Sequence, residues 1–279
     1  MVVLPRFLYI FQSIPICIPQ LYFKKLDSII SSFIWAGKVP RISKKHLFKD
    51  KMNGGLSLPN FKLYYLAAHL NIFSFWRGCI PGIDLTEQPS WLLIEHLSCQ
   101  RSCLPALLNS PTKIKNTVYK KNPIIQNSLK VWNQFLLLTR APKMYLDTPI
   151  CDNHAFFLDS VLAVKSYTKV AISTYYKVLL GVSSPSSHLF RVQWQEELGI
   201  EITEERWQDC IKNIYNSSIN ARHVLIQFRV VHRLHLSPSK MNKIYSNVSY
   251  LCAKCLNDPG TLSHVFLQCQ KLQVFWDSI

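Results

Sequence analysis

Three cysteines and one histidine near the end of the chain have the types and spacing needed to hold a metal ion. They are Cys252, Cys255, His264 and Cys269, in the pattern C-x2-C-x8-H-x4-C. Thiolates and imidazole suit tetrahedral Zn²⁺, and the turn at 258–260 lets the chain double back between the two close pairs. Because these ligands would fill all four positions and leave none for an activated water, we predict a structural zinc site.

The residues leave other interpretations of this quartet open. Three thiols and a core histidine can occur together by coincidence, and a disulfide would need an oxidising compartment and leave an odd cysteine. The zinc can also be only a staple for a short segment, without a contact to nucleic acid. Apolar residues at helical spacing follow Cys269, and we expect them to pack on the zinc module: Leu272, Phe275, Trp276 and Ile279.

The chain is strongly basic, with 32 Lys and Arg against 16 Asp and Glu over 279 residues, a net charge of +16. This balance favours a polyanionic partner, because each neutralised phosphate releases a counterion. The charge is concentrated early, with 11 basic and 2 acidic residues in 1–80 against 10 and 8 in 186–279. Residues 38–51 hold six basic residues and one acid, which predicts a basic loop; a merely solvated loop is the alternative.

Composition and helical spacing predict a mainly α fold. We expect helices at four ranges, 20–36, 123–139, 187–198 and 219–235. Two further helices should begin at the N-cap residues Asn60 and Thr203. The apolar face of the helix at 20–36 would carry Tyr22, Leu26, Ile29, Ile30 and Phe33. The apolar face of the helix that begins after Asn60 would carry Leu63, Leu66, Ala67 and Leu70. The apolar face of the helix that begins after Thr203 would carry Trp207, Cys210, Ile211 and Ile214. Residues 81–121 should be loops with short helices, and 156–180 one or two helices.

On the helix at 219–235, three arginines seven and four residues apart should share one face. These are Arg222, Arg229 and Arg233, and they are candidates for contact with RNA; an ordinary amphipathic helix with a solvated basic face is the favoured explanation. No run of 18 apolar residues predicts a membrane span. Prolines at 15 and 19 interrupt the only segment that resembles a signal peptide, so we expect an intracellular protein with reduced thiols.

Several segments resemble the C-terminal half of LINE-type, non-LTR retrotransposon reverse transcriptases, most closely those of frog- and fish-type elements. The segments are "LPRFLYIFQSIPICIP", "FIWAGKVPRIS", "GGLSLPNFKLYYLAA" and the Cys/His quartet. "FRVVHRLHLSPSKM" also fits the family's Arg-x-x-x-(Ser/Thr)-Pro pattern at Arg233, Ser237 and Pro238. These segments touch both ends of the chain, whereas residues 81–185 match only vaguely.

The resemblance implies four segments: a palm tail and thumb-like helical part (1–80), a poorly defined linker (81–185), a helical C-terminal region (186–250) and a zinc segment (251–279). A thumb follows the phosphates of the template–primer duplex, which makes Lys38, Arg41, Lys44 and Lys45 candidate contacts. Two helices flank this basic loop, so we expect it to protrude stiffly.

The chain also departs from the family. It contains no Asp-Asp pair to hold catalytic Mg²⁺ and no endonuclease, so we expect no polymerase activity and a truncated element copy. The favoured function is a non-catalytic fragment that binds RNA and RNA–DNA or DNA duplex, without a membrane or small-molecule partner. The family places it in a cytoplasmic ribonucleoprotein and the nucleus. A zinc-stapled helical interaction module is the alternative.

Overall fold

The structure is a computed structural model that describes residues 3–78, 89–98, 104–109, 122–138, 171–183 and 188–278. Within these ranges the protein is mainly helical and has no strand, only one antiparallel bridge between Leu251 and Pro259. The mainly α fold is therefore confirmed. The chain divides into two compact units: unit 1 is 1–39 with 59–184, and unit 2 is 40–58 with 185–279.

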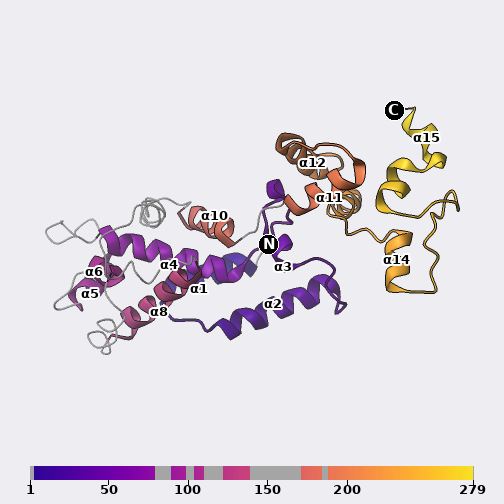
Figure 1. The fold of residues 1–279 in the computed structure, drawn as a ribbon. Helices are drawn as coiled ribbons and strands as arrows, with labels where there is room; N and C mark the ends of the chain where they lie inside the picture. The colour runs from indigo at the N-terminus through magenta and orange to yellow at the C-terminus, as the bar shows by residue number, and fades with distance from the viewer. Residues whose placement is uncertain are drawn as a thin grey trace. The chain divides into compact units, whose positions relative to one another are not determined.

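Unit 1 is built around one central helix. Its described helices are α1 (Val3–Ser13), α2 (Gln20–Trp35), α4 (Phe61–Gly78), α5 (Ser90–Leu97), α6 (Leu104–Asn109), α8 (Pro123–Leu138) and α10 (Ala171–Ser183) (Figure 1). Helix α4 packs against α1, α6, α8 and α10. Its fully buried Tyr65, Phe73 and Trp76 form the middle of a core rich in aromatic rings, which explains why this helix organises the unit.

Local sequence signals set the ends of two of these helices. The Asn60 side chain accepts a hydrogen bond from the backbone N–H of Leu63 at 3.1 Å, so the predicted cap of α4 is confirmed. Asn122 does the same for Ile124 at 3.0 Å, at the start of α8. The predicted apolar face of α4 is buried as expected: Leu63, Leu66, Ala67 and Leu70. The predicted helix segment 156–170 lies outside the described residues.

Helix α2 spans nearly the predicted range but buries only part of the predicted stripe. It ends at Trp35, where Ala36 and Gly37 take the left-handed conformation. Phe23 is its buried residue, and Leu26 and Ile30 pack partly on the core. Other members of the predicted stripe are exposed: Tyr22 at 43%, Ile29 at 66% and Phe33 at 87%. Two members of the predicted stripe therefore lie against the core and three are exposed, because apolar residues follow two sides of this helix.

His69 of α4 lies fully buried in unit 1. Its Nδ1 lies 3.0 Å from the carbonyl of Tyr65, and its Nε2 has no hydrogen-bond partner among the described residues. Burial lowers the pKa of His69 to about 4, against a small opposing effect of the Tyr65 carbonyl. The imidazole is therefore neutral at pH 7 and resists protonation in the folded state.

Acidification should destabilise unit 1 through His69. Below the ordinary pKa of 6.5 the unfolded chain takes up a proton at this residue, whereas the folded chain does not until near pH 4. We expect a loss of about 2 kcal/mol of unfolding free energy between pH 7.5 and pH 5. Urea unfolding at both pH values should show that His69→Gln lacks this part of the dependence; equal dependence in wild type and variant would contradict the assignment.

Unit 2 combines the C-terminal part of the chain with a short segment from much earlier. Its described elements are α3 (Lys44–Phe48), the 3-10 turn η1 (Lys51–Asn53), α11 (His188–Leu198), α12 (Glu204–Asn216), α13 (Ala221–Val231), α14 (Pro238–Ile244), the π-helical turn η3 (His264–Gln268) and α15 (Gln270–Trp276) (Figure 1). We call residues 40–58 the docked segment, because η1 packs against α12 of the same unit.

Close contacts hold the docked segment in place. Ile42 and Leu47 are buried, at 8% and 4% exposure. A Cβ on Gly54 would lie 3.0 Å from His232 Nε2, and the Tyr215 hydroxyl donates a hydrogen bond to the carbonyl of Gly55. The expectation of a stiffly protruding loop is therefore wrong: apolar residues between the lysines anchor the segment.

Helices α11 and α12 follow the prediction closely, whereas α13 does not. Gly199 is left-handed (φ +65°) after α11, and the Thr203 hydroxyl accepts the backbone N–H of Arg206 at 3.3 Å. Trp207, Ile211 and Ile214 of α12 are buried, but Cys210 is exposed, contrary to expectation. Helix α13 ends at Val231 instead of continuing to 235. No described helix is long and apolar enough to cross a membrane.

Candidate metal centre

A tight backbone turn presents the first two cysteines. The bridge between Leu251 and Pro259 pairs the two ends of the turn, and Cys252 N–H donates to the Asp258 carbonyl at 2.8 Å. Between them the chain reverses with Leu256 in the left-handed region (φ +58°), and Leu256 N–H donates to the Cys252 carbonyl at 2.9 Å. The C-x2-C spacing thus places both sulfur atoms on one side of the turn.

The other two ligands come from the π-helical turn η3. His264 opens this turn and Cys269 follows it directly; Cys269 N–H donates to the His264 carbonyl at 2.9 Å. In an α-helix, side chains five residues apart point about 140° away from each other. In a π-helical turn, the N–H of residue i+5 donates to the carbonyl of residue i, which widens the turn, so that the side chains of His264 and Cys269 face the same point. The sequence spacing alone did not reveal this turn.

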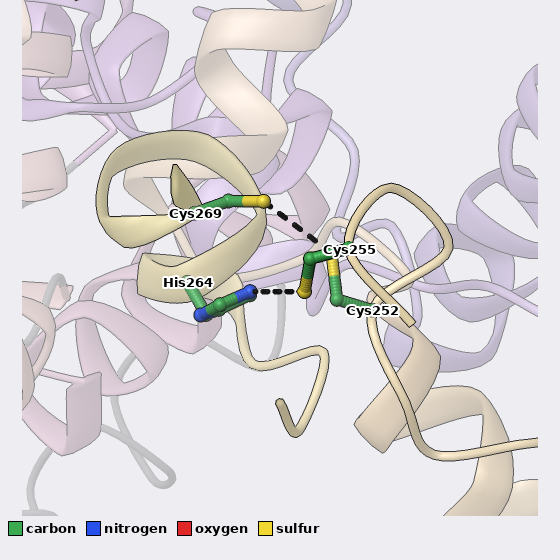
Figure 2. A group of neighbouring side chains, drawn as sticks. All are labelled: Cys252, Cys255, His264 and Cys269. Carbon is green, nitrogen blue, oxygen red and sulfur yellow. Dashed lines mark hydrogen bonds between the residues drawn. The ribbon is translucent and has the colours of Figure 1, made fainter. Parts of the chain in front are cut away.

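The four ligand atoms form a compact group (Figure 2). All lie within 4.8 Å of one another, with Cys252 Sγ and Cys269 Sγ 3.9 Å apart and Cys255 Sγ 3.3 Å from His264 Nε2. Zn–S and Zn–N bonds in a tetrahedron imply separations of about 3.8 Å and about 3.6 Å. The cluster fits a structural zinc ion, as predicted, and the cysteines are free rather than joined as disulfides.

Two thiols of the quartet, those of Cys255 and Cys269, differ in how readily they lose a proton. Backbone N–H groups of Asp258 and Asn257 lower the pKa of Cys255 to about 6. Burial instead raises the pKa of Cys269 above its ordinary value. A metal ion would bind the first as a thiolate already present near pH 7 and displace a proton from the second. Metal uptake should therefore release protons and weaken in acid.

Residues outside the quartet hold the histidine segment in place. The Thr261 hydroxyl accepts the backbone N–H of His264 at 3.1 Å. Glu197 of α11 accepts the hydroxyl of the preceding Ser263 at 2.5 Å and its N–H at 3.3 Å. Supporting contacts of this kind orient the residues that bind a metal. The contact between Glu197 and Ser263 joins residues 66 positions apart, so no local pattern in the sequence indicates it.

Glu197 also binds the arginine of the Arg-x-x-x-Ser-Pro pattern. The Arg233 guanidinium forms an ion pair with Glu197 and lies over the Trp194 ring, 4.7 Å from its centroid. Burial opposes ionisation of Glu197, but hydrogen bonds from Ser263 and Arg233 hold its pKa below the ordinary value. Glu197 of α11 therefore joins Arg233 to Ser263 of the zinc segment.

The prediction that three arginines share one helical face is wrong. Arg222 and Arg229 lie on α13, but Arg233 lies beyond its end at Val231 and has a left-handed backbone (φ +54°). Arg222 is exposed and Arg229 half-buried. Nothing in the structure tests whether these residues contact nucleic acid, and that role stays a prediction.

The four basic residues predicted to contact phosphates, in or next to the docked segment, are all exposed. Lys38 belongs to unit 1, whereas Arg41, Lys44 and Lys45 belong to unit 2, the two lysines on α3. In contrast, the neighbouring Lys49 is only 4% exposed. On the docked segment, the side chains of Arg41, Lys44 and Lys45 are thus exposed to solvent, whereas that of Lys49 is buried.

The apolar stripe after Cys269 packs less than predicted. Leu272 is half-buried, and Trp276 donates its indole N–H to the carbonyl of Phe266 at 3.1 Å. Phe275 remains 54% exposed and the unpredicted Val274 79%. Ile279 lies outside the described residues. The expected packing of this stripe on the zinc module is therefore wrong for Phe275.

Taken together, fold and cluster define a mainly helical protein with a candidate Cys3His zinc centre. Residues 186–276 match the sequence model of a family described as zinc-binding in reverse transcriptase. The matched range includes all four clustered ligands and the Glu197–Arg233 pair. The C-terminal segment of this chain is thus related to the zinc-binding part of reverse transcriptases, which agrees with the expected resemblance in this region.

Proposed function

We propose that this chain is a non-catalytic part of a LINE-type reverse transcriptase, which binds nucleic acid and is stabilised by one structural zinc. The main support is that the four clustered ligands fall within the segment matched by the reverse-transcriptase family. In an intact enzyme, this part would help to hold element RNA and target DNA during target-primed reverse transcription. Its partners are RNA and template–primer duplex, in a cytoplasmic ribonucleoprotein and the nucleus.

Charge and exposure support a role in binding phosphates. The chain carries a net charge of +16, and Arg41, Lys44 and Lys45 are exposed on the docked segment. Contacts to phosphates position a nucleic acid and carry little sequence information. Binding through these residues should therefore tolerate many sequences and weaken steeply with salt.

Neutralising Lys38, Arg41, Lys44 and Lys45 together should reduce the salt dependence of binding. If all four contact phosphates of a duplex, the slope of log K against log salt should flatten by about 3–4. The slope should be measured for wild type and the quadruple alanine variant on two RNA–DNA hybrids of unrelated sequence.

A matched variant separates these contacts from a general effect of charge. Replacing Lys24, Lys25, Arg206 and Lys212 with alanine removes the same charge from exposed positions elsewhere. We expect its slope to remain close to that of wild type. Equal slopes for all three proteins would remove Lys38 and the docked segment from the binding surface.

One observation favours the alternative, a zinc-stapled helical interaction module. Several basic side chains near the zinc centre serve internal contacts: Arg233 pairs with Glu197, and Lys254 Nζ donates to the Val265 carbonyl at 2.9 Å. A wild-type chain with no salt-dependent affinity for RNA or duplex would favour this module over the proposed function.

A further inference from the structure

Unit 2 contains a groove of about 620 Å³ beside the zinc segment. One wall is formed by α14 and the residues that lead into it, and the other by Thr261 and Leu262, just before the ligand His264. Gln193 and Glu197 of α11 complete the described lining. The polar and charged side chains that line it include Arg233, His235, Ser239, Lys240, Lys243 and Thr261. Cations and hydroxyl groups together are the usual donors to phosphate oxygens.

The lining carries an excess of positive charge. Among the lining residues that the structure describes, Glu197 is the one carboxylate, and Arg233 pairs with it. Lys240 donates one hydrogen bond, to the Arg233 carbonyl at 2.9 Å, and its ammonium group has two further protons. Lys243 is exposed and forms no hydrogen bond or ion pair with any residue that the structure describes. Two lysines therefore remain for an anion outside the protein.

Backbone contacts hold the two walls together. A Cβ on Gly260 would lie 2.7 Å from the ring of Pro238, so only glycine allows this approach. Ser239 N–H donates to the Gly260 carbonyl at 3.1 Å. Because Gly260 belongs to the turn that presents Cys252 and Cys255, the folded zinc segment shapes the groove. The spacing of the lysines on α14 is likewise fixed.

The groove offers little for recognising bases. His235 is the aromatic side chain of its lining, and it packs edge-on against Phe266 with ring centroids 5.1 Å apart. Burial and the nearby charges of Arg229 and Lys240 lower the pKa of His235, so it is neutral at pH 7. With a single, half-buried aromatic ring among its described lining residues, the groove has no stacking platform for successive bases, whereas its lysines and hydroxyl groups suit phosphate.

We propose that this groove binds the phosphodiester backbone of a single nucleic-acid strand, with Lys240 and Lys243 as the principal contacts. The proposal rests on the proposed function and assigns one of its binding surfaces to residues distinct from the docked segment. Because the contacts are to phosphate, the site should accept RNA strands of any sequence.

The decisive comparison uses the full zinc-loaded chain and a labelled 20-nucleotide poly(U) strand. Each lost phosphate contact on a single strand reduces the salt slope by about 0.7, so Lys240→Gln with Lys243→Gln should flatten it by about 1.4. We expect the affinity to fall about tenfold near 0.15 M salt. The control, Lys177→Gln with Lys212→Gln, removes two exposed lysines outside the groove and should behave as wild type.

Two further variants keep the outcome clear. Lys243→Gln alone disturbs no described internal contact and should still flatten the slope by about 0.7. Replacing both lysines with arginine keeps the charge and should retain the slope. If wild type binds poly(U) with the same dependence of log K on log salt as the single and the double glutamine variants, the proposed role of the groove is wrong, and the proposed function still stands. A wild type that binds no RNA would overturn the proposed function and the groove with it.

Discussion

Replacing Cys269 with serine should abolish stable zinc binding and unfold the segment that carries the quartet. Cys269 is fully buried, and its sulfur lies 3.9 Å from Cys252 Sγ. Structural zinc sites of this kind contribute about 10–16 kcal/mol of apparent binding free energy, which is coupled to folding. The turn at 250–260 and η3 have few other buried side chains, so they depend on the metal. Zinc content should fall from one per chain to near zero.

Elemental analysis and limited proteolysis would measure this effect. Protein purified without added metal should contain zinc, and the Cys269→Ser variant should be cleaved rapidly between 250 and 276. Cys210→Ser provides the control, because Cys210 is an exposed free cysteine outside the cluster. Full zinc occupancy in the Cys269→Ser variant would exclude the ligand set.

Gly55→Ala should release the docked segment from unit 2. An added Cβ would lie 2.0 Å from the Lys49 carbonyl oxygen and 2.4 Å from Lys49 Cβ, so the backbone must move. The same movement would disturb two hydrogen bonds of Gly55. Its carbonyl accepts the Tyr215 hydroxyl, and its N–H donates to the Asp50 carbonyl at 2.9 Å. We expect the unfolding free energy of unit 2 to fall by about 3 kcal/mol.

Chemical denaturation combined with amide exchange would locate this loss. Exchange should accelerate in the docked segment and α12 and remain unchanged in α4. Gly181→Ala is the matched control, because its Cβ would meet nothing within 4 Å and α10 is an ordinary helix there. That variant should gain about 0.5–1 kcal/mol. A Gly55→Ala protein as stable as wild type would show that the segment does not depend on this contact.

Features governed by neighbouring residues were predictable from the sequence. The caps at Asn60, Asn122 and Thr203 depend on a side chain and an N–H group two or three residues away. The buried face of α4 follows from apolar spacing alone. The candidate zinc ligands were recognisable because a tetrahedral metal constrains the spacing of the cysteines and the histidine that bind it.

Features governed by distant residues were not predictable. The docked segment is anchored by Tyr215 and His232, more than 150 residues away, and no local pattern records this. Arg233 was expected on a helical face because its partner Glu197 could not be identified in advance. Apolar spacing on α2 indicated an amphipathic helix, but it could not show which apolar side meets a partner. The π-helical turn likewise depends on the metal-ligand arrangement as a whole.

The position of the docked segment in the chain has a consequence during translation. Ile42 and Leu47 leave the ribosome long before the rest of unit 2, including Phe190, Phe228 and His232, which lie around the same small cavity as Ile42. At usual rates of synthesis the delay is roughly 10 to 30 s, far longer than the folding of a local helix. Throughout that interval, apolar side chains lie exposed on a strongly basic nascent chain. We therefore expect the segment to need protection from aggregation during synthesis, and a chain whose synthesis stops before residue 232 lacks part of the surface against which it packs.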